Sequence, residues 1–348
     1  MRLHVPFGGP DRGNLQIEGN QAMKKILFAS TALVLSAGVA AAEVTVGGDG
    51  RMGVVYGETP TNENEFSFNS RIRISFTATG ETDTGLAFGG SIRADNAAPG
   101  SITATITDAN GLSPGDVGFD PTTVQIANES SGGGVNGLAG SVFVSGAFGK
   151  LSMGDVDSAA QAAVGQVSGV GYTGIGDLNE ISYIGVPLDE SALYEGTFGG
   201  FTVYGSIDQI SDDSTAVSIA AGYEFAGVAV ALGYEDVEDL GDHIVVGASG
   251  TFAGATLKAV YGHFDVDGGG DIDQFAISAD YTFGATTVTG FVQGDDTDGI
   301  DDDTDLNYGI GAAYDLGGGA VLKGGIAHDG DAANDADVRA DFGITMSF

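Results

Sequence analysis

The amino-acid sequence predicts an all-β fold, a closed 16-stranded antiparallel transmembrane β-barrel. Three observations predict it. Apolar and polar residues alternate with a period of two along many segments, which is typical of strands with one apolar face. Short glycine-containing turns alternate with longer Asp-rich loops between these segments, as in a series of hairpins. After residue 42 no segment approaches the roughly 18 apolar residues that a membrane helix needs, so a membrane-spanning chain must cross with strands.

The first 42 residues read as a targeting sequence that precedes the barrel. Residues 23–42 (MKKILFASTALVLSAGVAAA) combine lysines, an apolar stretch and small residues before Glu43, the architecture of a cleaved secretory signal peptide. A membrane-anchor helix is the alternative, but the apolar stretch is short and hydroxyl residues interrupt it. We therefore interpret residues 1–22 as an upstream mis-start, residues 23–42 as the signal peptide and residues 43–348 as the barrel.

The composition excludes several classes of protein. The chain has 48 acidic and 12 basic residues, a formal net charge of −36, and so negative a field repels the phosphates of nucleic acid. Because 42% of the residues are hydrophobic, the chain is not expected to be disordered. The absence of cysteine excludes disulfides, thiolate metal sites and a cysteine nucleophile.

No enzyme is predicted. The sequence contains neither G-x-S-x-G nor H-E-x-x-H, and His243, His263 and His328 lie on different predicted hairpins. A secreted Ca²⁺-dependent β-roll, the other binding alternative, would need nonapeptide Gly-Asp repeats. The turn aromatics here instead recur at a spacing of 27 residues from Phe198 to Phe225.

The predicted strands follow the alternation along the chain. In residues 66–79, for example, aromatic and aliphatic side chains occupy one parity while Ser, Asn, Arg and Thr occupy the other. The predicted strands are residues 43–56, 66–80, 84–97, 138–148, 150–156, 190–198, 201–208, 214–225, 228–236, 242–252, 255–264, 272–283, 286–293, 305–315, 320–328 and 336–348. Two stretches do not fit a short hairpin: residues 98–137, interpreted as a long outer loop, and residues 156–190.

The connections indicate which face of the barrel meets lipid. A cylinder of 16 strands is too wide for side chains to fill, so it encloses water and its apolar parity faces outward. The tight turns carry an aromatic or leucine side chain at Phe148, Phe198, Phe225, Phe252, Phe283 and Leu316. These side chains predict an aromatic girdle at one membrane interface, the alternative being packed turn residues. The last strand runs to Phe348 because it must pair with the first to leave no open edge in lipid.

Several segments resemble the trimeric porins of purple bacteria and their alphaproteobacterial relatives. They are residues 43–56 (EVTVGGDGRMGVVY), 70–73 (SRIR), 82–89 (TDTGLAFG), 145–155 (SGAFGKLSMGD), 281–288 (YTFGATTV) and 309–319 (GIGAAYDLGGG), with the terminal Phe348. The resemblance covers residues 43–348. It implies a homotrimer in the outer membrane of a Gram-negative bacterium, surrounded by lipid and lipopolysaccharide. Each barrel would let small hydrophilic solutes and ions diffuse passively through a water-filled pore, without a required cofactor.

The resemblance also implies an inward-folded constriction loop. In the family the loop after the fifth strand folds into the barrel, and residues 156–190 occupy that place here. Residues 98–137 are longer than the family's second outer loop, so their role at the pore mouth or over a neighbouring subunit is open.

Five arginines share the polar, inward parity of strands that are neighbours in a closed barrel. They are Arg51, Arg71, Arg73, Arg93 and Arg339. An arginine facing lipid at mid-membrane costs about 2–4 kcal/mol, which favours the inward orientation. We therefore predict an arginine ladder on one side of the pore; the alternative is a set of solvated lumen residues.

Carboxylates of the predicted constriction loop are expected opposite the arginine ladder. The candidates are Asp155, Asp157, Asp177 and Glu180, the alternative being an acidic external loop. Opposed charges would create a transverse field that favours small hydrophilic solutes, and the acid excess would favour cations. Separately, the spacing of Asp265, Asp267, Asp271 and Asp273 suits a weak Ca²⁺ or Mg²⁺ site, but it lacks the full EF-hand spacing and terminal Glu, so a solvated loop is the favoured interpretation.

Overall fold

The computed structural model describes residues 43–58, 64–95, 102–107, 125–130, 138–185, 191–208, 215–297, 305–330 and 338–348. The predicted mis-start and signal peptide, residues 1–42, lie outside the described residues and stay predictions. In the described ranges no helix has the length and apolar character needed to cross a membrane.

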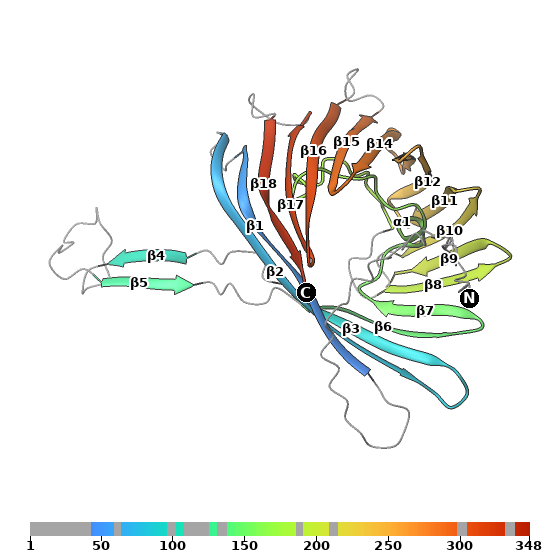
Figure 1. Cartoon of the computed structure of the whole chain (residues 1–348). Helices are drawn as coiled ribbons and strands as arrows, with labels where there is room; N and C mark the ends of the chain where they lie inside the picture. The colour runs from blue at the N-terminus through green and yellow to red at the C-terminus, as the bar shows by residue number, and fades with distance from the viewer. Residues whose placement is uncertain are drawn as a thin grey trace, which may run out of the picture.

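Sixteen strands form a closed antiparallel barrel, which confirms the predicted fold (Figure 1). Each pairs with its neighbour in the chain, β3 pairs with β6, and β1 pairs with both β2 and β18. The barrel strands are β1 (Glu43–Glu58), β2 (Asn64–Glu81), β3 (Ala87–Asp95), β6 (Leu138–Gly146), β7 (Gly149–Gly154), β8 (Ser191–Phe198), β9 (Phe201–Ile207), β10 (Ala216–Phe225), β11 (Val228–Val237), β12 (Gly241–Phe252), β13 (Ala255–Val266), β14 (Ile272–Phe283), β15 (Thr286–Thr297), β16 (Asp305–Gly317), β17 (Ala320–His328) and β18 (Val338–Ser347).

The predicted long loop contains a small sheet of its own. Strands β4 (Ile102–Thr107) and β5 (Gln125–Ser130) pair only with each other and are not part of the barrel wall. The sequence pattern did not distinguish these two six-residue strands, which lie in the stretch that did not fit a short hairpin. The rest of residues 98–137 up to the start of β6 lies outside the described residues.

The alternation places apolar side chains on the outside of the barrel. In β2, Phe66, Phe68 and Ile72 are 76%, 94% and 45% exposed, whereas Arg71 and Arg73 have the opposite parity. In β12 the odd-numbered residues from Gly241 to Gly247 are buried inside the barrel, whereas Ile244, Val246 and Ala248 are exposed. The outer surface is therefore the apolar band that lipid requires.

The tight turns gather at one end of the barrel. Their aromatic and leucine neighbours, Phe148, Phe198, Phe225, Phe252, Phe283 and Leu316, are 48–71% exposed. In the β10–β11 turn, Ala226 and Gly227 have φ of 52° and 80°, the type I′ geometry that matches the twist of paired strands. Ala253 and Gly254 repeat it in the β12–β13 turn, with φ of 50° and 87°.

The last residue completes the closure of the sheet. Strands β1 and β18 pair from Asp49↔Ser347 to Tyr56↔Ala340. Beyond Ser347, Phe348 N–H donates to the Gly48 carbonyl at 3.0 Å and Gly48 N–H donates to the Phe348 carbonyl at 2.7 Å. The carboxyl-terminal residue is thus the final rung of the seam between the first and last strands.

Candidate pore constriction

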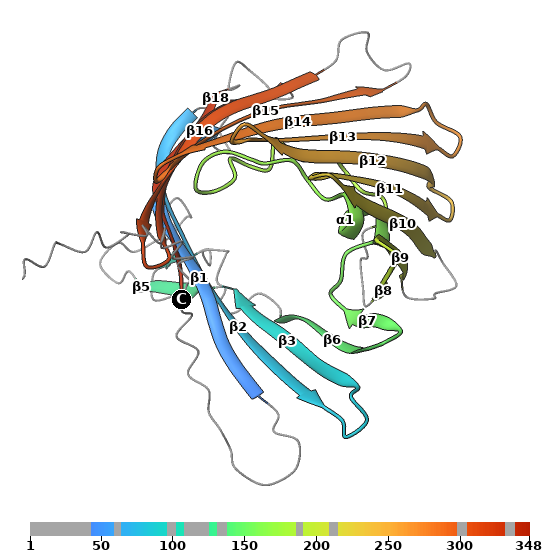
Figure 2. The same ribbon diagram turned by 45° about the vertical axis from the view of Figure 1, so that its right-hand side comes forward.

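Residues 155–185, here called the inward segment, lie inside the barrel. They follow β7 and include one short helix, α1 (Ala159–Val164). Figure 2 shows α1 within the curve of β9–β12, and the chain that follows it running beneath β12–β16. This arrangement agrees with the inward-folded loop that the sequence resemblance implies.

The barrel wall caps both ends of α1. A helix leaves its first N–H groups and last carbonyls without helical partners, and here side chains supply them. At the start of the helix, Ser206 Oγ accepts from Ala159 N (2.8 Å), Ser218 Oγ accepts from Ala160 N (2.9 Å) and Ser158 Oγ accepts from Gln161 N (3.2 Å). At its end, Lys258 Nζ donates to the Val164 carbonyl (2.7 Å). The helix also packs closely, because a side chain at Gly233 would approach Ala160 Cβ within 2.5 Å. So short a helix is held by the barrel rather than by its own sequence.

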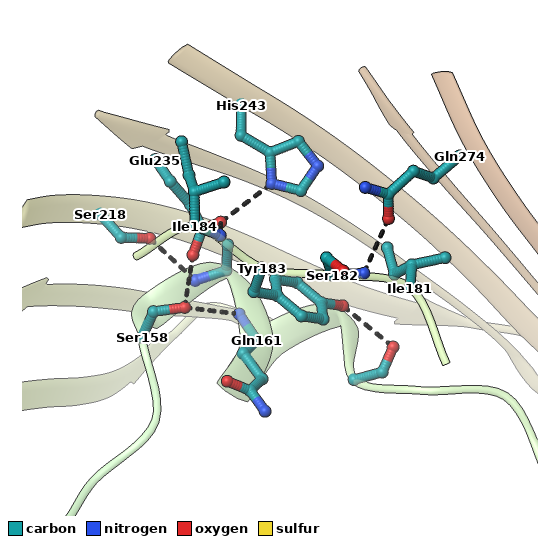
Figure 3. A network of polar contacts seen from close by, with 12 residues as sticks. Ser158, Gln161, Ile181, Ser182, Tyr183, Ile184, Ser218, Glu235, His243 and Gln274 are labelled. Atoms are coloured by element: carbon teal, nitrogen blue, oxygen red, sulfur yellow. Dashed lines mark hydrogen bonds and ion pairs between the residues drawn. The ribbon is translucent and has the colours of Figure 1, made fainter. Parts of the chain in front are cut away.

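A buried carboxylate joins the two ends of the inward segment to the wall (Figure 3). Glu235 of β11 and His243 of β12 are both 0% exposed, and His243 Nδ1 lies 2.9 Å from Glu235 Oε2. Ser158 Oγ donates to Glu235 Oε1 at 2.5 Å, and the Ile184 N–H donates to Oε2 at 3.0 Å. Sequence reasoning did not identify this pair. The sequence signal that could have indicated this pair is a glutamate and a histidine at inward positions of neighbouring strands that are rich in apolar residues.

A second carboxylate holds the middle of the inward segment. Asp341 of β18, 7% exposed, accepts from Tyr172 N (3.1 Å), Thr173 N (2.7 Å) and Thr173 Oγ1 (2.5 Å). Arg51 of β1 donates to the Thr173 carbonyl at 3.0 Å. Gly171, with φ of 79°, fits beside this carboxylate because a Cβ there would lie 2.2 Å from Asp341 Oδ1. The segment therefore reaches from the β9–β12 wall to the β1–β18 seam.

Apolar side chains fill the space between the inward segment and the wall. Val164, Val167, Ile181 and Tyr183 of the segment pack with Val245, Val260 and Ala276 of β12–β14. Farther along, Val170 and Ile175 pack with Phe291 of β15 and Ala327 of β17. The only hydrophobic clusters found among the described residues thus lie between the segment and the barrel.

The predicted arginine ladder lies on β1, β2, β3 and β18, four consecutive strands of the barrel. Arg51 pairs directly with Arg71 across β1 and β2. The arginines find carboxylates on the wall itself: Arg71 Nη2–Asp49 (3.7 Å), Arg73 Nε–Asp95 (2.9 Å), Arg93 Nε–Asp95 (4.0 Å) and Arg339–Asp329. Sequence reasoning did not identify these wall acids as partners, because the parity of a residue does not specify its contacts.

The four predicted loop acids lie on the exposed side of the inward segment. Asp155, Asp157, Asp177 and Glu180 are exposed, whereas Ser158, Ile175, Asn179 and Ile181 near them are buried. In the part of the chain that the structure describes, no ion pair joins any of them to an arginine. Partial burial, and then the neighbouring Asp155, raises the pKa of Asp157; partial burial and Asp177 do the same for the pKa of Glu180. Their opposition to the arginine ladder stays a prediction.

The acidic residues proposed for a divalent cation do not form a ready metal site. Among the residues described, no group of three or more His, Asp or Glu side chains is arranged to hold a metal ion. Asp273 instead accepts from Tyr261 Oη at 2.6 Å and contacts His263 Nδ1 at 2.8 Å. The Ca²⁺ or Mg²⁺ site at Asp265, Asp267, Asp271 and Asp273 therefore stays an untested hypothesis.

Comparisons with known proteins agree with the barrel. A family model described as Gram-negative porin matches residues 29–334. A porin of Rhodobacter capsulatus is 34% identical over 312 residues, which are 78% of this chain and 90% of the relative. A solved porin structure refined at 1.8 Å resolution has a TM-score of 0.67 and 30% identity, covering 88% of this chain and 100% of its own. A triple mutant of Rhodopseudomonas blastica porin, 24% identical with a TM-score of 0.61 and the same coverages, shows the fold alone.

Proposed function

Because the chain belongs to the Gram-negative porin family, an outer-membrane channel family, we propose that its pore favours cations and takes this selectivity from charges at its constriction. In this proposal small hydrophilic solutes and ions diffuse passively between the inward segment and the strands that the segment leaves uncovered. The arginine ladder forms one side of the opening. The four loop acids, Asp155, Asp157, Asp177 and Glu180, form the other.

The exposure pattern of the inward segment is the observation that supports the proposal. The segment's contacts run along β9–β18 and β1 and reach β2 where Tyr172 Oη donates to the Asn69 carbonyl at 3.4 Å. Among the described residues, no hydrogen bond or ion pair joins the segment to Arg71, Arg73 or Arg93. The segment's buried side is mainly apolar, with Ser158 and Asn179 among the buried residues, whereas its exposed side carries carboxylates. Opposed charges at a narrow, wet opening orient dipolar solutes and act on each passing ion. The excess of acid over base, −36 for the chain, favours cations approaching the pore.

Planar-bilayer recording tests the selectivity. The Arg71→Ala, Arg73→Ala double variant should raise the cation-to-anion permeability ratio, measured from the reversal potential in a KCl gradient. A unit charge about 6 Å from a passing ion in water contributes about 0.7 kcal/mol, which is about threefold for one ion. Because each removed charge acts with opposite sign on cations and anions, the permeability ratio should change by about tenfold or more at low salt. A Lys150→Ala, Lys323→Ala variant removes the same charge away from the arginine strands and should change the ratio less. Equal effects of the two variants would contradict the assignment, and wild-type protein without channels would reject the proposal as a whole.

We further propose the homotrimeric assembly and outer-membrane lipid environment that the sequence resemblance implies. The outward-facing side chains of β1, β3 and β6, such as Val46, Ile92 and Val142, are 46%, 45% and 63% exposed in a single chain. They are therefore open to a second subunit or to lipid. Unheated protein in dodecyl sulfate should migrate as a trimer and convert to monomer on boiling. Migration as a monomer at every temperature, with monomer mass in mild detergent, would contradict the trimer.

A further inference from the structure

We propose that the buried Glu235–His243 pair is the anchor that fixes the position of the inward segment, and so sets the width of the pore. This inference rests on the proposed channel function and goes beyond it, because it assigns a positioning role to residues that do not face the open lumen. The carboxylate of Glu235 has two oxygens, and each holds a different end of the inward segment.

The geometry makes this carboxylate unusual among the contacts of the segment. Ser158 precedes α1 by one residue and Ile184 lies 26 residues later, yet both donate to Glu235. Most other contacts hold only one point: Ser206 and Ser218 hold the start of α1, and Gln274 holds the returning chain. Losing Glu235 would therefore release the departing and the returning chain together.

The histidine completes the anchor by orienting the carboxylate. Glu235 at 0% exposure would be costly to bury without donors, and His243 Nδ1 supplies the third donor at 2.9 Å. His243 is itself held in place by edge-on rings of Tyr183 and Phe264, each with its centroid 6.1 Å away. A side chain at Gly262 would approach His243 Nε2 within 2.6 Å, so that position leaves room for the ring. Phe264 and Gly262 belong to the barrel wall, so the wall itself orients the acceptor, and Tyr183 adds its contact once the segment is docked.

The Glu235→Gln variant tests the anchor with little change of shape. The amide is neutral, so both ends of the segment lose a hydrogen bond to a charged carboxylate. An NH₂ group turned toward the Ile184 N–H removes that bond outright, whereas one turned toward Ser158 forces the hydroxyl to accept instead of donate. We expect the segment to spend about tenfold more time displaced, seen as brief steps to higher conductance and passage of larger polyethylene glycols. Glu195→Gln removes one exposed carboxylate from β8 and is the matched control, expected to conduct as wild type does.

A reversible tether separates loop movement from a general weakening of the barrel. The chain has no cysteine, and a Cβ built at Gly247 lies 3.7 Å from Val164 Cβ, within the range that a disulfide bridges. Val164→Cys with Gly247→Cys should therefore tie α1 to β12 when oxidised. Adding this pair to Glu235→Gln should suppress the conductance steps under oxidation and restore them on reduction. Steps that persist when the tether is closed, or a Glu235→Gln channel as steady as wild type, would overturn the proposal.

A second readout does not depend on conduction. Val164 is 5% exposed, so the thiol introduced by Val164→Cys alone should react slowly with a maleimide and about tenfold faster when Glu235→Gln is added. This arm tests the anchor even if wild-type protein forms no channel, an outcome that would reject the proposed function instead. Equal labelling rates would overturn the anchor. Should Glu235→Gln fail to fold, Ser158→Ala replaces it, because this variant removes one contact of the same carboxylate. Faster maleimide labelling would then support the anchor, and an unchanged labelling rate would overturn it.

Discussion

Deletion of Phe348 should weaken the barrel although it removes only the last residue of the chain. Phe348 and Gly48 exchange two backbone hydrogen bonds, of 2.7 and 3.0 Å, at the end of the β1–β18 seam. The Phe348 ring also covers this site, since a Cβ at Gly48 would lie 2.9 Å from it. Without Phe348, both polar groups of Gly48 that point toward β18 lose their partner.

The expected cost follows from these two bonds. Each backbone hydrogen bond contributes about 1 kcal/mol, and each polar group left unpaired away from water costs about 1–3 kcal/mol. Because the seam ends at the turn end of the barrel, water reaches Gly48 in part and the lower values apply. We therefore expect the deletion to lower the free energy of unfolding by about 2–4 kcal/mol.

Urea unfolding of the refolded protein in lipid vesicles measures this change. The chain has 11 tyrosines and no tryptophan, so tyrosine fluorescence and circular dichroism can follow the transition. The control is Phe348→Leu, which keeps both backbone bonds and should stay within about 1 kcal/mol of wild type. The reasoning is refuted if the deletion unfolds at the same urea concentration as wild type, or if Phe348→Leu loses as much stability as the deletion.

Three further predictions concern the inward segment and its contacts. In Gly53→Ala the new Cβ would lie 2.3 Å from a carbonyl oxygen of β18 and 2.8 Å from the Tyr172 ring. The free energy of unfolding should therefore fall by about 2 kcal/mol or more in the same urea assay. An unchanged unfolding midpoint would contradict the close packing. The pKa values of Asp157 and Glu180 are raised, so as the pH falls these two side chains should lose their charge at a higher pH than ordinary carboxylates do, and the cation preference should fall with it. The reversal potential measured against pH checks this. A reversal potential that changes only at the pH where ordinary carboxylates titrate, or that is unaltered by Asp157→Asn with Glu180→Gln, would contradict the prediction. Asp341→Asn places an NH₂ group in place of a carboxylate oxygen that accepts from the backbone of the segment. This change should weaken docking of the segment by about 1.5–3 kcal/mol and make conductance steps at least about tenfold more frequent than in wild type. A steady current would show that the apolar contacts alone suffice to hold the segment.

The barrel was predictable because its information is local. A period of two, tight turns and the need for closure together predict sixteen strands, and the parity of Arg71 or Arg73 indicates that it faces inward. Contacts between distant segments were not predictable in the same way. Glu235 and Asp341 bind residues 77 and 169 positions away in the chain at Ser158 and Tyr172, and no spacing rule connects such pairs.

The inner wall nevertheless leaves a mark of the inward segment in the sequence. A barrel around open water should be polar at every inward position, yet Val245, Val260, Ala276 and Phe291 occupy inward positions of β12–β15 and are at most 4% exposed. Each of these strands therefore has an apolar residue among its inward positions, as in Ile244-Val245-Val246, whereas the inward positions of β2 from Glu65 to Glu81 are all polar. Burying an apolar side chain is favourable only where something excludes water, and the inward segment does so along these strands. In a water-filled barrel, buried apolar side chains at inward positions thus indicate where an inward-folded segment packs, and a strand with only polar inward positions, such as β2, indicates wall against which no apolar side of the segment packs.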